Sequence, residues 1–393
     1  MTALAVGVTA PRGFAASGVE AGLKQHGGRD LALVVNRGPR AASAGVFTSN
    51  RVVAAPVTLT RSHLAAGTLR AVVLNSGGAN ACTGRPGARD AQATAARAAA
   101  ALGLEPGQVG VCSTGLIGQR LPLDLLLPGI DQAAAALEED DEAALAAADA
   151  IRTTDTVPKT AVATGDGWSI GGMAKGAGML APGLATMLCV LTTDAVLDDA
   201  GAASALEEAV RTTFNRTDSD GCMSTNDSVI LLSSGASGTA PDPAAFTEAL
   251  REICARLARQ LIADAEGATH DIAVTVAGAS DEAAAEAVAR AVARSNLFKA
   301  AVFGNDPNWG RVVAEVGTVP AEVAPFDPSQ LDVSINGVMV CRQEGVGEPR
   351  ERVDMTAREV RVLVDLHAGE ARATVWTNDL THGYIHENSA YSS

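Results

Sequence analysis

The stretch that organises this chain runs from Lys175 to Asp194 and reads Lys-Gly-Ala-Gly-Met-Leu-Ala-Pro-Gly-Leu-Ala-Thr-Met-Leu-Cys-Val-Leu-Thr-Thr-Asp. From Thr186 onward the residues are mostly apolar or β-branched, which predicts a buried β-strand. The run before it, 181–185, contains proline, glycine and alanine and indicates a loop. By pattern alone, Thr186 is a β-forming residue that opens a core strand.

Around this stretch, short apolar runs alternate with alanine-rich segments. The pattern predicts strands at 31–35, 44–48, 52–59 and 71–75, and helices at 88–102, 130–153, 202–214, 243–266 and 280–295. Asp242 before Pro243 is typical of a helix N-cap followed by proline in the first turn. Further apolar runs at 272–276, 297–303, 331–335, 360–366 and 371–376 predict a second α+β unit with its own sheet.

The composition excludes several classes of protein. Among 393 residues there are 45 acidic and 30 basic side chains, a formal charge of −15, which disfavours a nucleic-acid partner. No apolar run approaches the ~20 residues of a membrane-spanning helix, and the first residues lack the pattern of a signal peptide. We therefore expect a cytoplasmic protein with no membrane partner.

Two glycine-rich segments could bind an anion. The run 75–80, Asn-Ser-Gly-Gly-Ala-Asn, follows a predicted strand and can aim backbone N–H groups at an anion, although a tight structural turn explains the same residues. The run 171–178 places Lys175 among glycines, but Gly176 stands where a phosphate-binding P-loop needs Ser or Thr. Lys175 could instead offer its ammonium to a substrate carboxylate.

Two further patterns have a functional and a structural interpretation. His382 and His386 have metal-ligand spacing on a helix, yet Gly383 and Tyr384 disfavour a helix and no third ligand is evident, so we expect no metal site. Ser113-Thr114-Gly115 follows an apolar run and could direct two donors at an oxyanion, or Ser113 or Thr114 could simply cap a helix.

The chain resembles the ornithine acetyltransferase family of arginine biosynthesis, a family of bifunctional, self-cleaving enzymes. The resemblance begins at Lys175-Gly-Ala-Gly-Met179 and Ala185-Thr-Met-Leu188 and spans nearly the whole chain. The other similar motifs, in the order of the family, are 113–118, Thr153-Thr-Asp-Thr156, Asp218-Ser-Asp-Gly-Cys-Met-Ser-Thr-Asn-Asp227, 264–268, Gly304-Asn-Asp-Pro-Asn-Trp-Gly-Arg311 and Glu387-Asn-Ser-Ala-Tyr-Ser-Ser393.

The resemblance implies that the chain cuts its own backbone between Ala185 and Thr186. The products would be an α fragment, 1–185, and a β fragment, 186–393, whose first residue is the nucleophile. A threonine hydroxyl is a weak nucleophile without an adjacent base, and cleavage provides one in the new α-amine of Thr186. With a reference pKa of roughly 7.7 to 8.0, that amine is partly neutral near pH 7 and can accept the hydroxyl proton.

Further roles follow from the same resemblance. The Thr114 hydroxyl and the Gly115 N–H would form the oxyanion hole. The positions that match substrate-contacting residues of the family are Thr153, Lys175, Thr186, Glu266, Asn388 and Ser393. Lys175 would hold an α-carboxylate, whereas Glu266 is either an acidic partner for an amino group or a polar organiser of the site.

The implied reaction is a ping-pong transfer. N-acetylornithine acetylates the nucleophile, ornithine leaves, and glutamate accepts the acetyl group to become N-acetylglutamate. No tightly bound cofactor or metal is required, and acetyl-coenzyme A is a candidate second donor. The implied fold is an α/β, α-β-β-α sandwich of two intertwined fragments with a smaller C-terminal α+β part, assembled as an α2β2 heterotetramer.

Two departures from the family pattern and two rival functions remain. Ala181 and Gly183 stand where many relatives have His and Asn, and Ser393 replaces a terminal Thr. We expect self-cleavage to survive, because the Ala185-Thr186 pair is intact.

The first rival function is a self-processing amidohydrolase or aminopeptidase of related fold, which would pass the acyl group to water. The second is a non-enzymatic binding protein in which Thr186 is only a core residue.

Overall fold

The computed structural model describes residues 6–179, 181 and 187–390, which form two compact units. The first unit holds the residues up to Asn215 together with Cys222–Leu261. The second holds Arg216–Gly221 and the residues from Ile262 onward. The predicted fragment boundary at Ala185–Thr186 lies outside the described residues and stays a prediction, because the compact units reflect packing and not cleavage.

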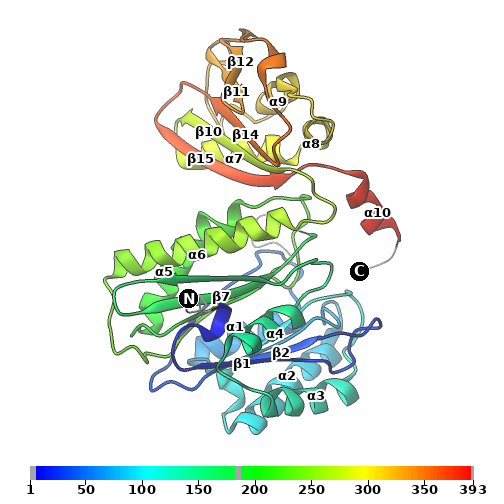
Figure 1. The fold of residues 1–393 in the computed structure, drawn as a ribbon, viewed down its shortest axis with the longest axis vertical. Coiled ribbons are helices and arrows are strands. Elements are labelled where there is room, and N and C mark those ends of the chain that lie inside the picture. Colours follow the sequence, from blue (N-terminus) through cyan, green and yellow to red (C-terminus); the bar gives the residue numbers. More distant parts are fainter. Residues whose placement is uncertain (1–5, 180, 182–186, 391–393) are drawn as a thin grey trace. The chain divides into compact units, whose positions relative to one another are not determined.

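A four-stranded sheet lies on one side of the first unit (Figure 1). Its strand order is β1-β2-β4-β5, with β4 and β5 parallel and the other pairs antiparallel. All residues of β2 and β4 are buried, as their continuous apolar runs predict. The strands are β1 Phe14–Val19, β2 Leu31–Asn36, β4 Ala71–Asn75 and β5 Val109–Ser113.

A five-stranded sheet combines strands from both sides of the predicted cleavage bond. Its order is β3-β9-β8-β7-β6, and β7 pairs antiparallel with β8 so that Lys175 lies opposite Leu188. The strands are β3 Ala42–Phe47, β6 Lys159–Thr164, β7 Ser169–Lys175, β8 Leu188–Thr193 and β9 Ser228–Ser233. The predicted α and β fragments therefore share one sheet.

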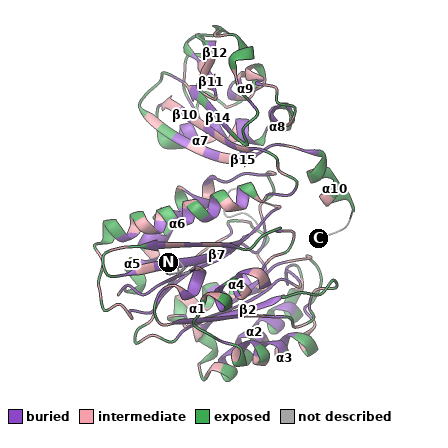
Figure 2. Cartoon of the chain, viewed as in Figure 1, coloured by how far each residue is buried: buried purple, intermediate pink, exposed green. Residues whose placement is uncertain are grey.

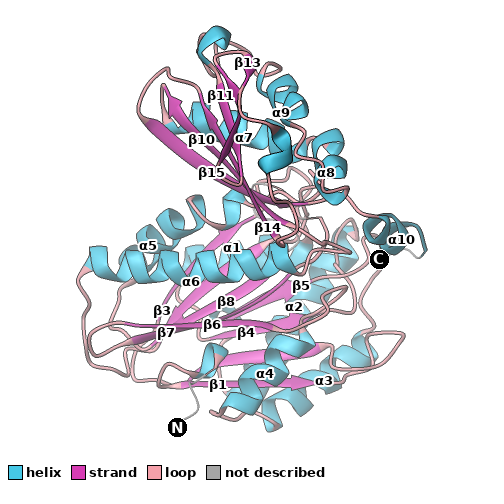
Figure 3. Cartoon of the chain, turned by 45° about the horizontal axis from the view of Figure 1, so that its top comes forward, coloured by secondary structure: helices cyan, strands magenta, loops and turns pink. Residues whose placement is uncertain are grey.

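The two sheets pack face to face through an apolar cluster that includes Phe14, Leu74, Val190 and Ile230. Helices cover the outer faces, with α2 and α3 on the four-stranded sheet and α5 and α6 on the five-stranded sheet (Figure 3). The interior of this unit is correspondingly buried (Figure 2). The predicted α-β-β-α sandwich is confirmed. Its helices are α1 Ala55–Ala66, α2 Gly84–Leu102, α3 Leu123–Ala135, α4 Asp141–Ala150, α5 Asp199–Arg211 and α6 Pro243–Ala263.

The second unit is the predicted α+β part. Its six-stranded sheet has the order β13-β12-β11-β14-β10-β15, and β14 alternates exposed and buried residues, so that one face packs on helices. The strands are β10 Asp271–Ala279, β11 Asp332–Ile335, β12 Val338–Arg342, β13 Gly345–Val346, β14 Glu359–Asp365 and β15 Ala371–Asn378. The helices are α7 Glu282–Arg294, α8 Asn296–Phe303, α9 Trp309–Val316 and α10 His382–Ala390.

The described residues also include short 3₁₀ helices. They are Gly7–Thr9, Pro106–Gln108, Phe214–Arg216, Pro328–Gln330 and Arg350–Arg352.

Two predicted strands are wrong. Residues 55–59 of the run 52–59 instead form the start of helix α1. Pro56 occupies the first turn, where a missing N–H is tolerated, and Val57 and Thr60 are buried on the same side of the helix. The run 297–303 is helix α8, because the Ser295 hydroxyl accepts a hydrogen bond from the Phe298 N–H and caps it. In both cases the sequence contains a helix-start signal, Pro56 or Ser295. The strand prediction gave more weight to the β-branched and apolar residues.

Two helix predictions also need correction. The single helix expected over 130–153 is two helices, because α3 ends at Ala135 and the Asp140 carboxylate accepts the Ala143 N–H to start α4. Residues His382–Ala390 form helix α10 although Gly383 and Tyr384 disfavour one. The predicted N-cap at Asp242 is confirmed by its hydrogen bond from the Ala245 N–H.

Candidate active site

Three predicted site residues meet in the first unit: Thr114 after strand β5, Thr153 in the loop after helix α4, and Lys175 at the end of strand β7. Lys175, the last residue of β7, is 1% exposed. Its Nζ donates to Thr153 Oγ1 at 2.7 Å and to Thr114 Oγ1 at 3.4 Å. Thr114, Gly115, Thr153 and Lys175 are called the strand-end cluster below. Their predicted roles are compatible with this geometry, because both threonine oxygens accept from the lysine and keep their own protons to donate.

The loop after β5 is held by backbone hydrogen bonds to the glycine-rich run after β4. The Thr114 N–H donates to Asn75 O, the Gly78 N–H to Thr114 O and the Ala79 N–H to Leu116 O, each at 3.0 Å. The interpretation of 75–80 as a structural turn is therefore supported, because the N–H groups of Gly78 and Ala79 hydrogen-bond to the loop after β5. No α-helix begins at Ser113 or Thr114, so the helix-cap interpretation of this motif is wrong.

Gly115 is required by its surroundings. Its φ is +128°, a conformation that L side chains rarely adopt, and a Cβ added there would lie 2.8 Å from the Gly78 nitrogen. The Gly78 N–H donates a hydrogen bond to Thr114 O. A shift of Gly78 or Gly115 to relieve the clash would therefore disturb a hydrogen bond that holds the loop. The backbone of the predicted oxyanion hole is thus fixed by close packing.

A cavity of about 190 Å³ adjoins Thr114 and Gly115. Ser224, Thr225 and Asn226 also line it, and Asn226 Nδ2 donates to Ala79 O at 2.6 Å and to Ser113 O at 2.8 Å. The lining residues are Ala79, Thr114, Gly115, Leu116, Ile117, Met179, Ser224, Thr225 and Asn226. Sequence analysis gave 224–226 no role, although they lie within a quoted family motif.

Two buried charged residues beside Lys175 were also missed. Asp155 and Lys159 have fully buried side chains joined at 2.6 Å, and Asp155 Oδ2 lies 4.0 Å from Lys175 Nζ. Burial alone would raise the pKa of Asp155, but the charges of Lys175 and Lys159 and hydrogen bonds from Lys159 and Gly176 lower it to about 2. Asp155 is therefore ionised at neutral pH.

The predicted nucleophile Thr186 lies outside the described residues, as do Ala185 and Ser393. Met187, the next residue, is buried, and its N–H donates to Asp227 Oδ1 at 3.0 Å. Asp227 is buried as well, which raises the pKa of its carboxyl well above the usual value despite that hydrogen bond. The start of strand β8 is thus anchored to a buried carboxyl group whose charged form is disfavoured by burial.

In the second unit, Glu266 and Asn388 form a pair. Asn388 Nδ2 donates to Glu266 Oε2 at 2.6 Å, and Glu266 is buried while Asn388, on helix α10, is exposed. We call these two residues the tail pair. The structure thereby joins two residues that are far apart in the sequence and that the family resemblance places at the substrate.

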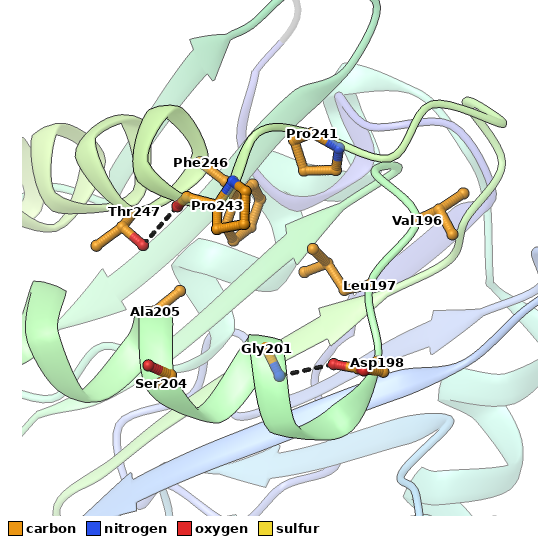
Figure 4. A pocket seen from close by; sticks show the side chains of 10 residues that line it. All are labelled: Val196, Leu197, Asp198, Gly201, Ser204, Ala205, Pro241, Pro243, Phe246 and Thr247. Atoms are coloured by element: carbon orange, nitrogen blue, oxygen red, sulfur yellow. Dashed lines mark hydrogen bonds between the residues drawn. The ribbon is translucent and has the colours of Figure 1, made fainter.

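A separate cavity of about 300 Å³ lies between the beginnings of α5 and α6 (Figure 4). Two of its polar side chains hydrogen-bond within the helix starts, because Asp198 Oδ1 accepts the Gly201 N–H at 2.7 Å and Thr247 Oγ1 donates to Pro243 O at 2.8 Å.

Across 6–179, 181 and 187–390, no group of three or more His, Cys, Asp or Glu side chains is placed to hold a metal. Nor does any helix within those ranges have the length and apolar character to cross a bilayer.

Comparison with known proteins identifies the family. The sequence model of the ArgJ family matches residues 15–393. The chain belongs to the ArgJ family. This confirms the resemblance found in the sequence.

Curated ArgJ proteins are similar to the chain over nearly its full length. It is 60% identical over 388 residues to the arginine biosynthesis bifunctional protein ArgJ of Streptomyces coelicolor, covering 98% of this chain and 100% of that protein. For the protein of the same name from Bifidobacterium longum the identity is 57% over 389 residues, with the same coverage. A crystal structure of ornithine acetyltransferase with ornithine, from Mycobacterium tuberculosis, is 53% identical, covers 47% of this chain and 96% of that chain, and gives a TM-score of 0.45.

Proposed function

We propose that this ArgJ-family protein transfers the acetyl group of N2-acetyl-L-ornithine to L-glutamate, in the cyclic route of arginine biosynthesis. Family membership supports this acyltransferase activity over the rival amidohydrolase. The observation that carries the proposal is the position of Lys175. Its buried ammonium contacts Thr114 beside the cavity. In the backbone register, Lys175 pairs with Leu188 on the neighbouring strand, two residues after the proposed nucleophile.

The first half-reaction acetylates Thr186 after cleavage of the Ala185–Thr186 bond. The α-amine takes the hydroxyl proton while Oγ1 bonds to the acetyl carbon, whose carbonyl oxygen becomes an oxyanion. The Thr114 hydroxyl and the Gly115 N–H stabilise that charge. The bond from the acetyl carbon to the ornithine nitrogen then breaks, and the α-amine returns its proton to the leaving ornithine amine.

The second half-reaction transfers the acetyl group to glutamate. The glutamate amine attacks the acetyl-threonine ester and loses a proton to the α-amine of Thr186. The ester bond then breaks, the α-amine returns that proton to Thr186 Oγ1, and N-acetylglutamate leaves. Lys175 holds the α-carboxylate, and Thr153 orients Lys175 through the 2.7 Å hydrogen bond. Holding acceptor and ester in one pocket replaces an encounter in solution with a unimolecular step.

The tail pair and Ser393 complete the proposed substrate site. Glu266 serves as an acidic partner for the ornithine side-chain amine or as an organiser of the site, and Asn388 fixes its carboxylate. A carboxylate that already accepts one amide donor has further lone pairs for an ammonium group. The roles of Glu266 and Asn388 are assigned from the family match, and they do not depend on the geometry of the strand-end cluster.

Several further properties belong to the same proposal. The reaction takes place in the cytoplasm and needs no tightly bound cofactor, and acetyl-coenzyme A acts as a second acetyl donor. The word bifunctional in the names of the relatives supports this second activity. The α and β fragments assemble as an α2β2 heterotetramer.

A transfer assay tests the proposal. Purified protein is incubated with N-acetylornithine and isotope-labelled glutamate, and labelled N-acetylglutamate is measured by mass spectrometry, with Thr186→Ala as the inactive control. Transfer that exceeds release of free acetate supports the proposal. Acetate release without N-acetylglutamate would favour the amidohydrolase, and no turnover of the donor would favour a binding protein. Replacing N-acetylornithine by acetyl-coenzyme A tests the second donor.

A further inference from the structure

Asn226 joins two loops beside the predicted oxyanion hole, and it is 4% exposed. Its Nδ2 donates to Ala79 O, in the loop after β4, at 2.6 Å and to Ser113 O, at the end of β5, at 2.8 Å. Its Oδ1 accepts the Thr225 hydroxyl at 2.6 Å, so the nitrogen and the oxygen of the amide are both hydrogen-bonded. A buried amide held at both ends is rigid and can fix the loops that it joins.

The Ser113 carbonyl belongs to the peptide that leads into the predicted oxyanion hole. The same peptide carries the Thr114 N–H, and the next one carries Thr114 O, which accepts the Gly78 N–H, together with the Gly115 N–H. A trans peptide is planar, so a hydrogen bond to its carbonyl also fixes the direction of its N–H. Asn226 therefore holds the peptide directly before the one that supplies the Gly115 donor.

The residue after Asn226 holds the approach to strand β8. Asp227 Oδ1 accepts the Met187 N–H at 3.0 Å, and Met187 O accepts the Ser228 N–H at 3.2 Å. Met187 directly follows the proposed nucleophile Thr186 in the sequence. Two consecutive side chains thus bind the oxyanion loop and the residue next to the nucleophile.

The backbone that carries Asn226 is itself held in place. Thr48 Oγ1 donates to Ser224 O at 2.6 Å, and the Ala54 N–H donates to Thr225 O at 3.0 Å. The Asn226 N–H donates to Ser224 Oγ at 3.1 Å. The amide of Asn226 is therefore presented from a fixed loop, as a positioning group requires.

We propose that Asn226 is a positioning residue that sets the oxyanion hole against the nucleophile strand in both half-reactions. It acts through the loop 113–115, whose Gly115 N–H and Thr114 hydroxyl are the proposed donors. Acetylation and deacetylation of the nucleophile both pass through a tetrahedral oxyanion, so misplaced donors should slow both steps. This inference rests on the proposed function and adds a positioning residue to its mechanism.

Asn226→Ala tests this role, and Asn36→Ala is the matched control. Asn36 is the last residue of β2 and is 3% exposed. Its Nδ2 also donates to two carbonyl groups, Arg40 O at 3.1 Å and Ser233 O at 2.9 Å. Ser233 is the last residue of β9, whereas Asn226 lies just before the first. The control thus removes the same kind of contact at the other end of that strand.

Each half-reaction is measured separately on cleaved protein, after intact mass has confirmed self-cleavage. N-acetylornithine alone gives the rate of acetylation of the β fragment, followed by rapid quenching and mass spectrometry. Glutamate added to the acetylated protein gives the rate of acetyl removal. The rate constant at saturation and the half-saturating concentration are determined for both steps, and denaturant unfolding gives the stability of each variant.

Asn226→Ala should slow both half-reactions by a similar factor. The two saturating rate constants should fall on the order of 10- to 100-fold, because displaced oxyanion donors lose part of their effect. The half-saturating concentrations should change by less than about threefold, since substrate binding is retained. Asn36→Ala should lower the stability by a comparable amount and leave both rate constants within about threefold of the unmodified protein.

Three results would overturn the inference. Unchanged rate constants in cleaved Asn226→Ala protein contradict it, and so does a loss confined to one half-reaction, which would indicate a substrate contact. Equal losses in Asn36→Ala also contradict it, because they would show general destabilisation.

A second variant decides the question if Asn226→Ala does not fold or does not cleave. Thr225→Val keeps Asn226 and removes the hydroxyl that holds its amide oxygen. It should slow both half-reactions about 3- to 10-fold, the effect of one hydrogen bond. Absent or unequal losses in this variant contradict the inference. Absence of acetyl transfer in the unmodified protein would instead refute the proposed function and is measured first.

Discussion

The strand-end cluster and the tail pair differ in how their residues are held. In the cluster, Lys175 is 1% exposed and donates to two hydroxyls, one just after strand β5 and one in the loop after helix α4. In the tail pair, an exposed asparagine on a single helix reaches one buried glutamate. Buried, cross-linked polar groups are pre-organised, whereas an exposed side chain keeps rotamer freedom. The comparison implies that substitutions in the cluster should impair the reaction far more than substitutions in the tail pair.

The largest effect is expected for Gly115→Ala. The added Cβ would clash with Gly78 and displace one oxyanion donor, so kcat should fall about 10²- to 10³-fold. The matched control is Gly118→Ala, because Gly118 also has a positive φ, +87°, but has no atom within 4 Å of an added Cβ. Equal losses in the two variants would show that backbone strain, and not the contact at Gly115, sets the effect.

Lys175→Ala should come next. Loss of the ammonium should raise the KM for glutamate on the order of 10- to 100-fold, while slow hydrolysis of N-acetylornithine changes much less. Steady-state transfer and acetate release are measured on the same preparation. Equal losses in transfer and hydrolysis would contradict the assigned role.

Asp227 should give a pH-dependent effect on stability. Burial raises its pKa in the folded protein, so the folded state binds one more proton than the unfolded state above pH ~4. The free energy of unfolding should therefore fall with rising pH, by about 1.4 kcal/mol per unit, until the folded-state pKa is passed.

The test of this titration is Asp227→Asn. The variant keeps an acceptor for the Met187 N–H and should lack the pH slope, so its stability relative to the unmodified protein should increase with pH. Denaturant unfolding between pH 5 and pH 9 measures the difference for both proteins. Parallel pH curves would mean that Asp227 is ionised in the folded protein.

The smallest effects should come from the tail pair. Asn388→Ala removes one hydrogen bond to Glu266 and should change kcat/KM for N-acetylornithine by less than about tenfold. Glu266→Gln keeps an acceptor for Asn388 and tests the charge, and Ser389→Ala on the same helix is the control. A loss as large as that of Lys175→Ala would remove the distinction between the two groups.

The sheets were largely predictable, because short continuous apolar runs such as 31–35 and 71–75 are typical of buried strands and are too short for most core helices. Helix α8 was missed because its cap, Ser295, resembles any other loop serine until its partner is known. The break between α3 and α4 was missed because alanine continues on both sides of it. Local composition therefore predicted which segments form helices and strands better than it predicted the residues at which they begin and end.

The site was only partly predictable. The family motifs identified Thr114, Thr153 and Lys175, and the fold brings the first and last within 3.4 Å across 61 residues. Lys159 belongs to no motif, and its buried contact with Asp155 could not be inferred from the sequence. Asn226 contacts Ser113 across 113 residues, which is equally invisible before folding.

The most direct test of the mechanism is the intact mass of freshly purified protein, together with N-terminal sequencing of every species. The account predicts two fragments, the second beginning with Thr186, whose new α-amine is the proposed base. A single chain of 39.7 kDa that persists in folded protein would contradict the mechanism. In that case Thr186 is a structural residue, or Ala181 and Gly183 have removed self-cleavage.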